Sequence, residues 1–84
     1  MRSLGLLMVP DVLETTPAYV DDVLDNSPAR RVDLRPDDLV LLVNGKRVES
    51  QRTFRAILRT IDRRDDVELT VQRDTQILSV VLRP

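Results

Sequence analysis

The chain has 84 residues, of which 42% are hydrophobic and 32% charged, enough for one small domain with a modest core. A formal net charge of −1 gives no long-range field that would attract nucleic acid or an anionic membrane, so neither partner is expected. The absence of cysteine and histidine excludes disulfide and thiolate chemistry and removes the commonest general base and metal ligand.

The first third of the chain predicts two strands joined by a loop. Residues 4–9 are a strand-like apolar run with a glycine near its start, and residues 10–17 carry two prolines, which indicates a loop. Residues 19–24 predict a second strand. The doubled acid Asp21-Asp22 interrupts its alternation, so we expect a bulge or an exposed edge there.

Residues 26–48 hold the most informative local signals. Ser27 can cap a short helical turn through its hydroxyl, and Pro28 suits the first helical position, where its missing N–H has no partner anyway. Residues 35–38, Arg-Pro-Asp-Asp, are typical of a turn. The apolar run at residues 39–43 predicts a strand covered on both faces.

The second half of the chain predicts a hairpin turn, a helix and two strands. Asn44 and Gly45 can supply the two positive-φ positions of a type I′ turn. Apolar residues then recur at i, i+3, i+4 and i+7 over residues 51–61, which predicts a helix with Ser50 as its N-cap. Alternation over residues 67–72 predicts a half-buried strand, and residues 77–82 return as its partner.

This order of elements resembles a PDZ domain of the kind attached to bacterial HtrA/Deg-type serine proteases. The resemblance rests on Asn-Ser-Pro-Ala at residues 26–29, the bend at residues 32–40 and Val-Asn-Gly at residues 43–45. Two glycines of the family's bend are replaced by Asp33 and Asp37, and aspartate tolerates left-handed geometry better than most residues. The resemblance implies an α+β, mainly β fold: a PDZ-like, partly open antiparallel β-barrel or sandwich of five to six strands, capped by one short and one longer helix.

By this resemblance, the start of the chain forms a carboxylate-binding loop. Ser3-Leu4-Gly5-Leu6 is similar to the family's x-Φ-G-Φ loop, in which successive backbone N–H groups hold a peptide's terminal carboxylate. The strand that follows would add an extended peptide to its unpaired edge. The alternative is a strand-opening glycine in an ordinary sheet. The predicted binding residues here are Ser3, Leu4, Gly5, Leu6, Leu7 and Met8.

The resemblance also makes the longer helix the second wall of the groove. Its first, fifth and eighth residues would face the ligand, and these are Gln51, Arg55 and Leu58. Leu58 would line the pocket for the ligand's last side chain together with Leu4 and Leu6, and Arg55 would favour an acidic or polar residue upstream. Plain core packing is the alternative for Leu58, and a solvated helix face is the alternative for Arg55.

No residue pattern indicates catalysis, a cofactor or a metal. The doubled acids, including Asp37-Asp38, are expected to be solvated turn residues, because neighbouring carboxylates in a strand point to opposite faces. The serines have no histidine to activate them. We therefore expect residues 1–84 to be a single non-catalytic domain excised from a larger protein, with no segment that inserts into a membrane.

The function that follows is a peptide-binding PDZ module. It would recognise C-terminal or unfolded segments by β-strand addition, as a substrate-binding or regulatory domain of an HtrA/Deg-type protease. Its partners would be peptide or protein C-termini with a hydrophobic last residue and the parent's own protease domain. The resemblance favours the cell envelope or periplasm. The alternative is an assembly module of another envelope protein, such as a tail-specific or intramembrane protease or a secretion component. Whether residues 10–17 cover the groove stays open.

Overall fold

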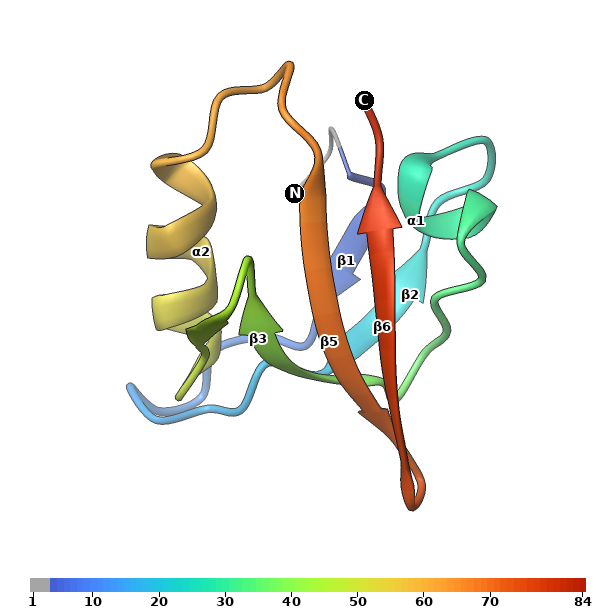
Figure 1. Ribbon diagram of the computed structural model, residues 1–84. Coiled ribbons are helices and arrows are strands. Elements are labelled where there is room, and N and C mark those ends of the chain that lie inside the picture. Colours follow the sequence, from blue (N-terminus) through green and yellow to red (C-terminus); the bar gives the residue numbers. More distant parts are fainter. Residues whose placement is uncertain (1–3) are drawn as a thin grey trace.

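The computed structural model describes residues 4–84 as two antiparallel sheets and two helices (Figure 1). The smaller sheet pairs β1 with β2, and the larger sheet has the strand order β4-β3-β5-β6. Within the described residues the sheets do not close into a barrel, so the mainly β, PDZ-like prediction is confirmed in its open form. The elements are β1 (Leu6–Met8), β2 (Val20–Val23), α1 (Pro28–Arg31), β3 (Leu39–Val43), β4 (Lys46–Arg47), α2 (Gln51–Arg59), β5 (Val67–Arg73) and β6 (Gln76–Leu82).

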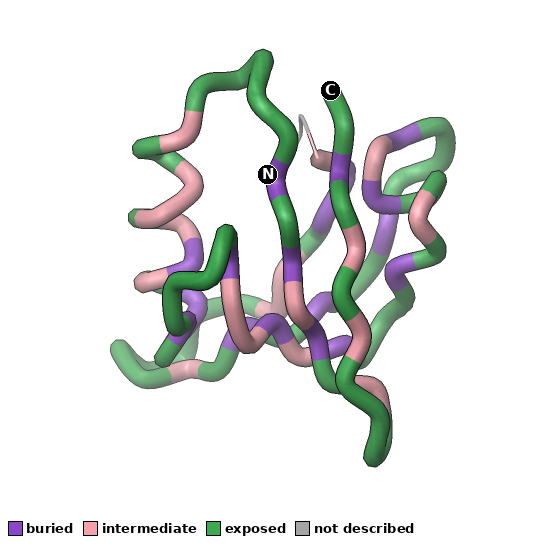
Figure 2. Tube along the Cα trace, viewed as in Figure 1, coloured by how far each residue is buried: buried purple, intermediate pink, exposed green. Residues whose placement is uncertain are grey.

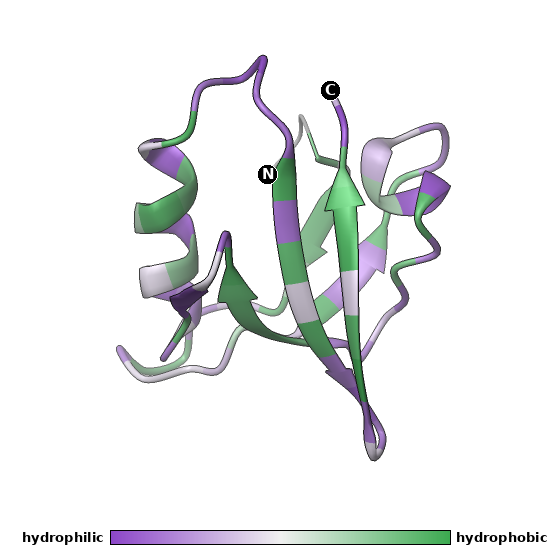
Figure 3. Cartoon of the chain, viewed as in Figure 1, coloured by the Kyte–Doolittle hydropathy of each residue, from purple (hydrophilic) through white to green (hydrophobic). Residues whose placement is uncertain are grey.

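The core lies between the two sheets and α2, and it is aliphatic apart from one phenylalanine. Phe54 on α2 is fully buried, and alternate residues of β5 face the same interior. Figure 2 shows these buried positions as purple bands, and Figure 3 shows that they coincide with hydrophobic residues. No helix within residues 4–84 is long and apolar enough to cross a bilayer.

Both helices begin at the predicted caps. The Ser27 Oγ accepts a hydrogen bond from the Arg30 N–H at 3.2 Å, and the Ser50 Oγ accepts one from the Thr53 N–H at 3.2 Å. Helix α2 ends at Arg59, two residues earlier than predicted. The cause is Thr60, whose N–H and hydroxyl both donate to the Ile57 carbonyl and tighten the last turn.

The bends adopt the left-handed geometry that the sequence required of them. Asn44 and Gly45 have φ angles of 49° and 80°, which confirms the predicted turn between β3 and β4. Asp33 and Asp37, which replace the family's glycines, have φ angles of 62° and 73°. Aspartate therefore takes over the backbone role of glycine at both positions, at the modest steric cost expected for a residue with a Cβ.

The predicted irregularity in β2 is present. Leu7 pairs with Asp22 and Met8 pairs with Val20, so the register skips Asp21. β1 keeps its regular alternation, because the extra residue lies in β2.

Asp38 corrects the prediction that all of the doubled acids are solvated. Its side chain is 1% exposed and accepts hydrogen bonds from the Nε and Nη2 of Arg73 on β5, at 2.9 and 2.8 Å. It also accepts the Arg35 N–H at 2.9 Å. The hydrogen bonds between Arg73 and the Asp38 carboxylate raise the pKa of Arg73 above its usual value. The carboxylate thus ties the bend before β3 to β5, and sequence spacing alone gave no sign of a partner 35 residues away.

Candidate functional site

The loop around Gly5 is held in place by the residues that start α1. The Leu4 carbonyl accepts the Ala29 N–H at 2.9 Å, and the Gly5 carbonyl accepts the Leu24 N–H at 2.8 Å. Gly5 has a φ of 82°, and a Cβ added to it would overlap with the side chain of Ser27. Only glycine fits this position, for reasons of both backbone geometry and space. Ser3 lies outside the described residues.

One edge of β1 carries backbone groups without a strand partner. The bonds from Leu24 to Gly5 and from Val9 to the Tyr19 carbonyl, at 2.8 and 3.1 Å, place the odd-numbered residues of this segment toward β2. Because backbone groups alternate along a strand, the N–H and C=O groups of Leu6 and Met8 point to the opposite edge. Within the described residues that edge pairs with no strand. It can therefore accept an added one.

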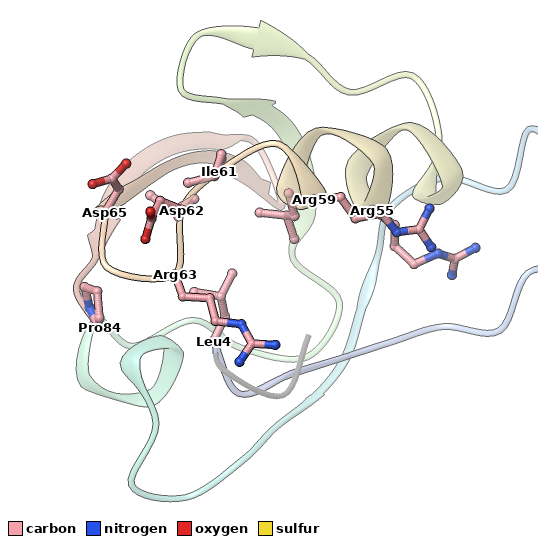
Figure 4. Close-up of a pocket in the computed structure, with 10 residues that line it drawn as sticks. Leu4, Arg55, Arg59, Ile61, Asp62, Arg63, Asp65 and Pro84 are labelled. Atoms are coloured by element: carbon pink, nitrogen blue, oxygen red, sulfur yellow. The ribbon is translucent and has the colours of Figure 1, made fainter.

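An apolar pocket opens where the Gly5 loop approaches the end of α2. It has a volume of about 470 Å³, and Figure 4 shows it between the loop that carries Leu4 and the segment that follows α2. Leu58 and Ile61 contribute from the α2 side, and Val67 contributes from the start of β5. Their side chains give the pocket an aliphatic lining suited to a branched or unbranched apolar group.

Charged side chains make up the other half of this pocket's lining. Arg55, Arg59 and Arg63 stand against Asp62 and Asp65, so cations outnumber anions by one. Arg63 makes no hydrogen bond or ion pair with any residue in the part of the chain that the structure describes, and Figure 4 shows it reaching toward Leu4. The Asp62 carboxylate accepts hydrogen bonds from the guanidinium and the backbone N–H of Arg64, and these bonds lower the pKa of the carboxyl group.

The predicted β1 residues contribute backbone more than side chains. Leu6 is fully buried in the core, and Leu7 is 42% exposed, away from that core. Met8 is half-buried and packs against the core. Among the described residues of the predicted loop and strand, Leu4 is the one whose side chain lines the pocket. Leu4 and Leu58 both line this pocket as expected, whereas Leu6 is buried in the core and is not among the lining residues.

Gln51 and Arg55 are held by a residue that sequence reasoning did not single out. Asp11, in the β1–β2 loop, accepts the Gln51 Nε2 at 2.8 Å through Oδ1, and its Oδ2 is bonded to Arg55 Nη2. The Arg55 guanidinium holds the pKa of the Asp11 carboxyl below its usual value near 3.8. A lone aspartate between prolines carries no pattern from which these contacts could have been predicted.

Residues 10–17 contact the first turn of α2. The Thr16 carbonyl accepts the Gln51 N–H at 2.7 Å, and Glu14 lies 3.4 Å from Arg52. The β1–β2 loop is therefore fastened to the first turn of α2. No residue of this loop is among those that line the pocket, although Asp11 bonds the lining residue Arg55.

A left-handed glycine loop, a strand with a free edge and a facing helix define the PDZ class of domains. The chain belongs to the PDZ family, whose sequence model matches residues 4–83. No curated protein sequence matches the chain significantly.

Two solved structures share the fold. The HtrA3 PDZ domain bound to a phage-derived ligand, FGRWV, is 23% identical with a TM-score of 0.76, covering 96% of this chain and 82% of that one. The PDZ domain of EpsC from Vibrio cholerae, residues 219–305, is 19% identical with a TM-score of 0.65, covering 93% and 90%. The resemblance to PDZ domains of the HtrA kind is thus confirmed at the level of the fold.

Proposed function

We propose that this PDZ domain binds the C-terminal ends of peptides and unfolded segments by adding them as an antiparallel strand to the free edge of β1. The observation that carries the proposal is the coincidence of three features at one place. The unpaired backbone of Leu6 and Met8 starts next to the left-handed turn at Gly5, and that turn stands at the mouth of the apolar pocket. Strand addition, carboxylate capture and side-chain selection can then act on one peptide end.

The pocket supports selection of a hydrophobic last residue. Leu4, Leu58, Ile61 and Val67 offer no hydrogen-bonding side chain to a polar group placed among them. A polar group would lose its hydrogen bonds to water there, whereas an aliphatic or aromatic side chain has none to lose. The HtrA3 ligand FGRWV ends in valine, a side chain that a cavity of about 470 Å³ can hold.

We further propose that the parent protein is an HtrA/Deg-type serine protease of the cell envelope, in which this domain binds substrate or contacts the protease domain. The fold shared with the HtrA3 PDZ domain and the motifs at residues 26–29 and 43–45 support this reading. An assembly module is the second candidate, in which the groove holds a segment of its own chain or of a neighbouring protein. The contact of the β1–β2 loop with α2 supports that candidate, because Asp11 and Thr16 of the chain itself bond Gln51 at the start of α2.

A peptide titration separates these candidates. FGRWV with a free carboxylate should bind with a dissociation constant on the order of micromolar, because a short flexible peptide loses entropy when it is ordered. The amidated peptide should bind at least about tenfold more weakly, since it lacks the terminal carboxylate that the backbone N–H groups of the Gly5 loop would hold. Equal binding of the two forms would contradict carboxylate capture, and no binding to any free C-terminus in a peptide library would favour the assembly module.

Two alanine variants locate the bound peptide. Leu58→Ala removes one wall of the pocket and should weaken binding by about 4- to 15-fold, the usual effect of one to two lost methylene contacts. Ile77→Ala is the matched control, because Ile77 is 59% exposed on β6 and contributes nothing to the pocket lining. It should leave affinity unchanged. Equal losses in both variants would contradict the assigned pocket.

A further inference from the structure

The contact between Asp11 and α2 lies on the ligand-facing side of the proposed groove. Gln51, Arg55 and Leu58 are spaced at i, i+4 and i+7, so they form one stripe along α2. Arg55 and Leu58 line the pocket at one end of this stripe. Asp11 bonds Gln51 at the other end of the stripe and Arg55 in its middle. In Figure 1 the β1–β2 loop passes the beginning of α2, as the bond from Gln51 to Thr16 requires.

The direction of strand addition brings an incoming peptide to this contact. A peptide whose terminal carboxylate lies at Gly5 and which pairs antiparallel with β1 must run upstream toward Met8 and the β1–β2 loop. β1 spans three residues, or about 10 Å at the usual rise per residue. The peptide therefore meets Asp11 after about three residues, at the point where the loop crosses to α2.

We propose that Asp11 is an internal occupant of the groove's upstream subsite, in the place where an acidic side chain of the ligand would bind. Its carboxylate takes the Gln51 amide N–H and the Arg55 guanidinium, the two groups that would otherwise read the peptide there. The wild-type domain consequently distinguishes little between charges at the third and fourth residues from the end of its ligand, because the groups that would read them are already bonded to Asp11. This inference rests on the proposed peptide-binding function.

Asp11 satisfies one end of the Gln51 amide and leaves the other end without a partner. Gln51 is 2% exposed, and its Oε1 is buried without a hydrogen-bond partner among the described residues. Asp11 has no donor to offer this oxygen, because its pKa is lowered and it stays ionised.

The test uses three peptides that differ in the charge of the third residue from the end: FGRWV, FGAWV and FGEWV. A second set carries the same three residues at the fourth position from the end. In the wild-type domain, affinities within each set should agree within about threefold, because Arg55 is already neutralised. In Asp11→Asn, Arg55 is released, and the glutamate peptide of at least one set should bind about 5- to 10-fold more tightly than its arginine partner.

Changing Arg55, the other partner of the ion pair, should reverse the preference between the glutamate and arginine peptides. Arg55→Gln leaves the Asp11 carboxylate uncompensated, so the arginine peptide should become the tighter ligand by a similar factor. The double variant Asp11→Asn/Arg55→Gln should return to no preference. A merely structural role for Asp11 would alter all peptides equally and would not reverse with the partner that is changed.

Glu14→Gln is the charge-matched control. It removes one negative charge from the same loop, but its partner Arg52 is exposed and off the stripe. Peptide preference should stay at the wild-type level in this variant. A preference in Glu14→Gln equal to that in Asp11→Asn, or none in Asp11→Asn, would overturn the inference. Failure of every peptide to bind any variant would instead overturn the proposed function.

Discussion

Replacing Asp38 with asparagine should destabilise the domain more than any other single change of charge. The carboxylate is 1% exposed and holds three donors: Nε and Nη2 of Arg73 and the N–H of Arg35. Removing one partner of a buried ion pair costs roughly 3–5 kcal/mol. Arg73 is 22% exposed and keeps a 3.0 Å bond to the Asp33 carbonyl, so water and that bond offset part of the loss. We expect a cost of about 2–4 kcal/mol.

That cost is large for a domain of this size. At the usual 0.05–0.15 kcal/mol per residue, a chain of this length has a total stability of roughly 4–13 kcal/mol. Urea unfolding followed by far-UV circular dichroism measures the change, since the chain has no tryptophan for fluorescence. In thermal unfolding, the same substitution should lower Tm by roughly 10–30 °C, since 1 kcal/mol corresponds to about 4–8 °C in a domain of this size.

Asp37→Asn is the matched control. Asp37 is the neighbouring residue of the same bend, is exposed, and has a φ of 73° that asparagine also tolerates. This substitution should change the free energy of unfolding by less than about 0.5 kcal/mol. A double-mutant cycle of Asp38→Asn with Arg73→Gln should give a coupling energy of about 2 kcal/mol. Equal effects of the two aspartate variants, or a coupling energy near zero, would refute the assigned ion pair.

Two further predictions concern the Gly5 loop and the Asp11 contact. Gly5→Ala should cost about 2–4 kcal/mol, from left-handed strain and overlap with Ser27. Gly45 has a similar φ of +80° but open space around it, so Gly45→Ala should lower the free energy of unfolding by about 1 kcal/mol in thermal unfolding. Equal losses in the two variants would contradict the close approach of Gly5 to Ser27. The Asp11 carboxyl should titrate by NMR below 3.8, and Arg55→Gln should restore its usual value. Because its native pKa is lowered, the contact's contribution is complete above the unfolded pKa near 3.9 and is lost as pH falls through the native one.

Much of the fold could be predicted because its signals are local. Ser27 and Ser50 cap helices whose first N–H groups lie only three residues ahead. Asn44 and Gly45 determine the β3–β4 turn through their own φ angles. Alternation along β5 needs no information beyond the strand itself. The resemblance to PDZ domains, which rests on the order of these elements, placed Leu4 and Leu58 on one pocket, and both side chains line it.

The sequence by itself therefore determined the order and type of the elements and the positions of their caps and turns, since those choices depend on neighbouring residues and on backbone geometry. Only the tertiary structure decided which charged side chains meet. Asp38 finds Arg73 at a separation of 35 residues, and Asp11 finds Gln51 and Arg55 at separations of 40 and 44. An aspartate in a loop looks the same in sequence whether water or a guanidinium surrounds it. Its partner is set by how loops and strands pack in space, and that packing also holds Gln51 and Arg55 to the domain's own loop.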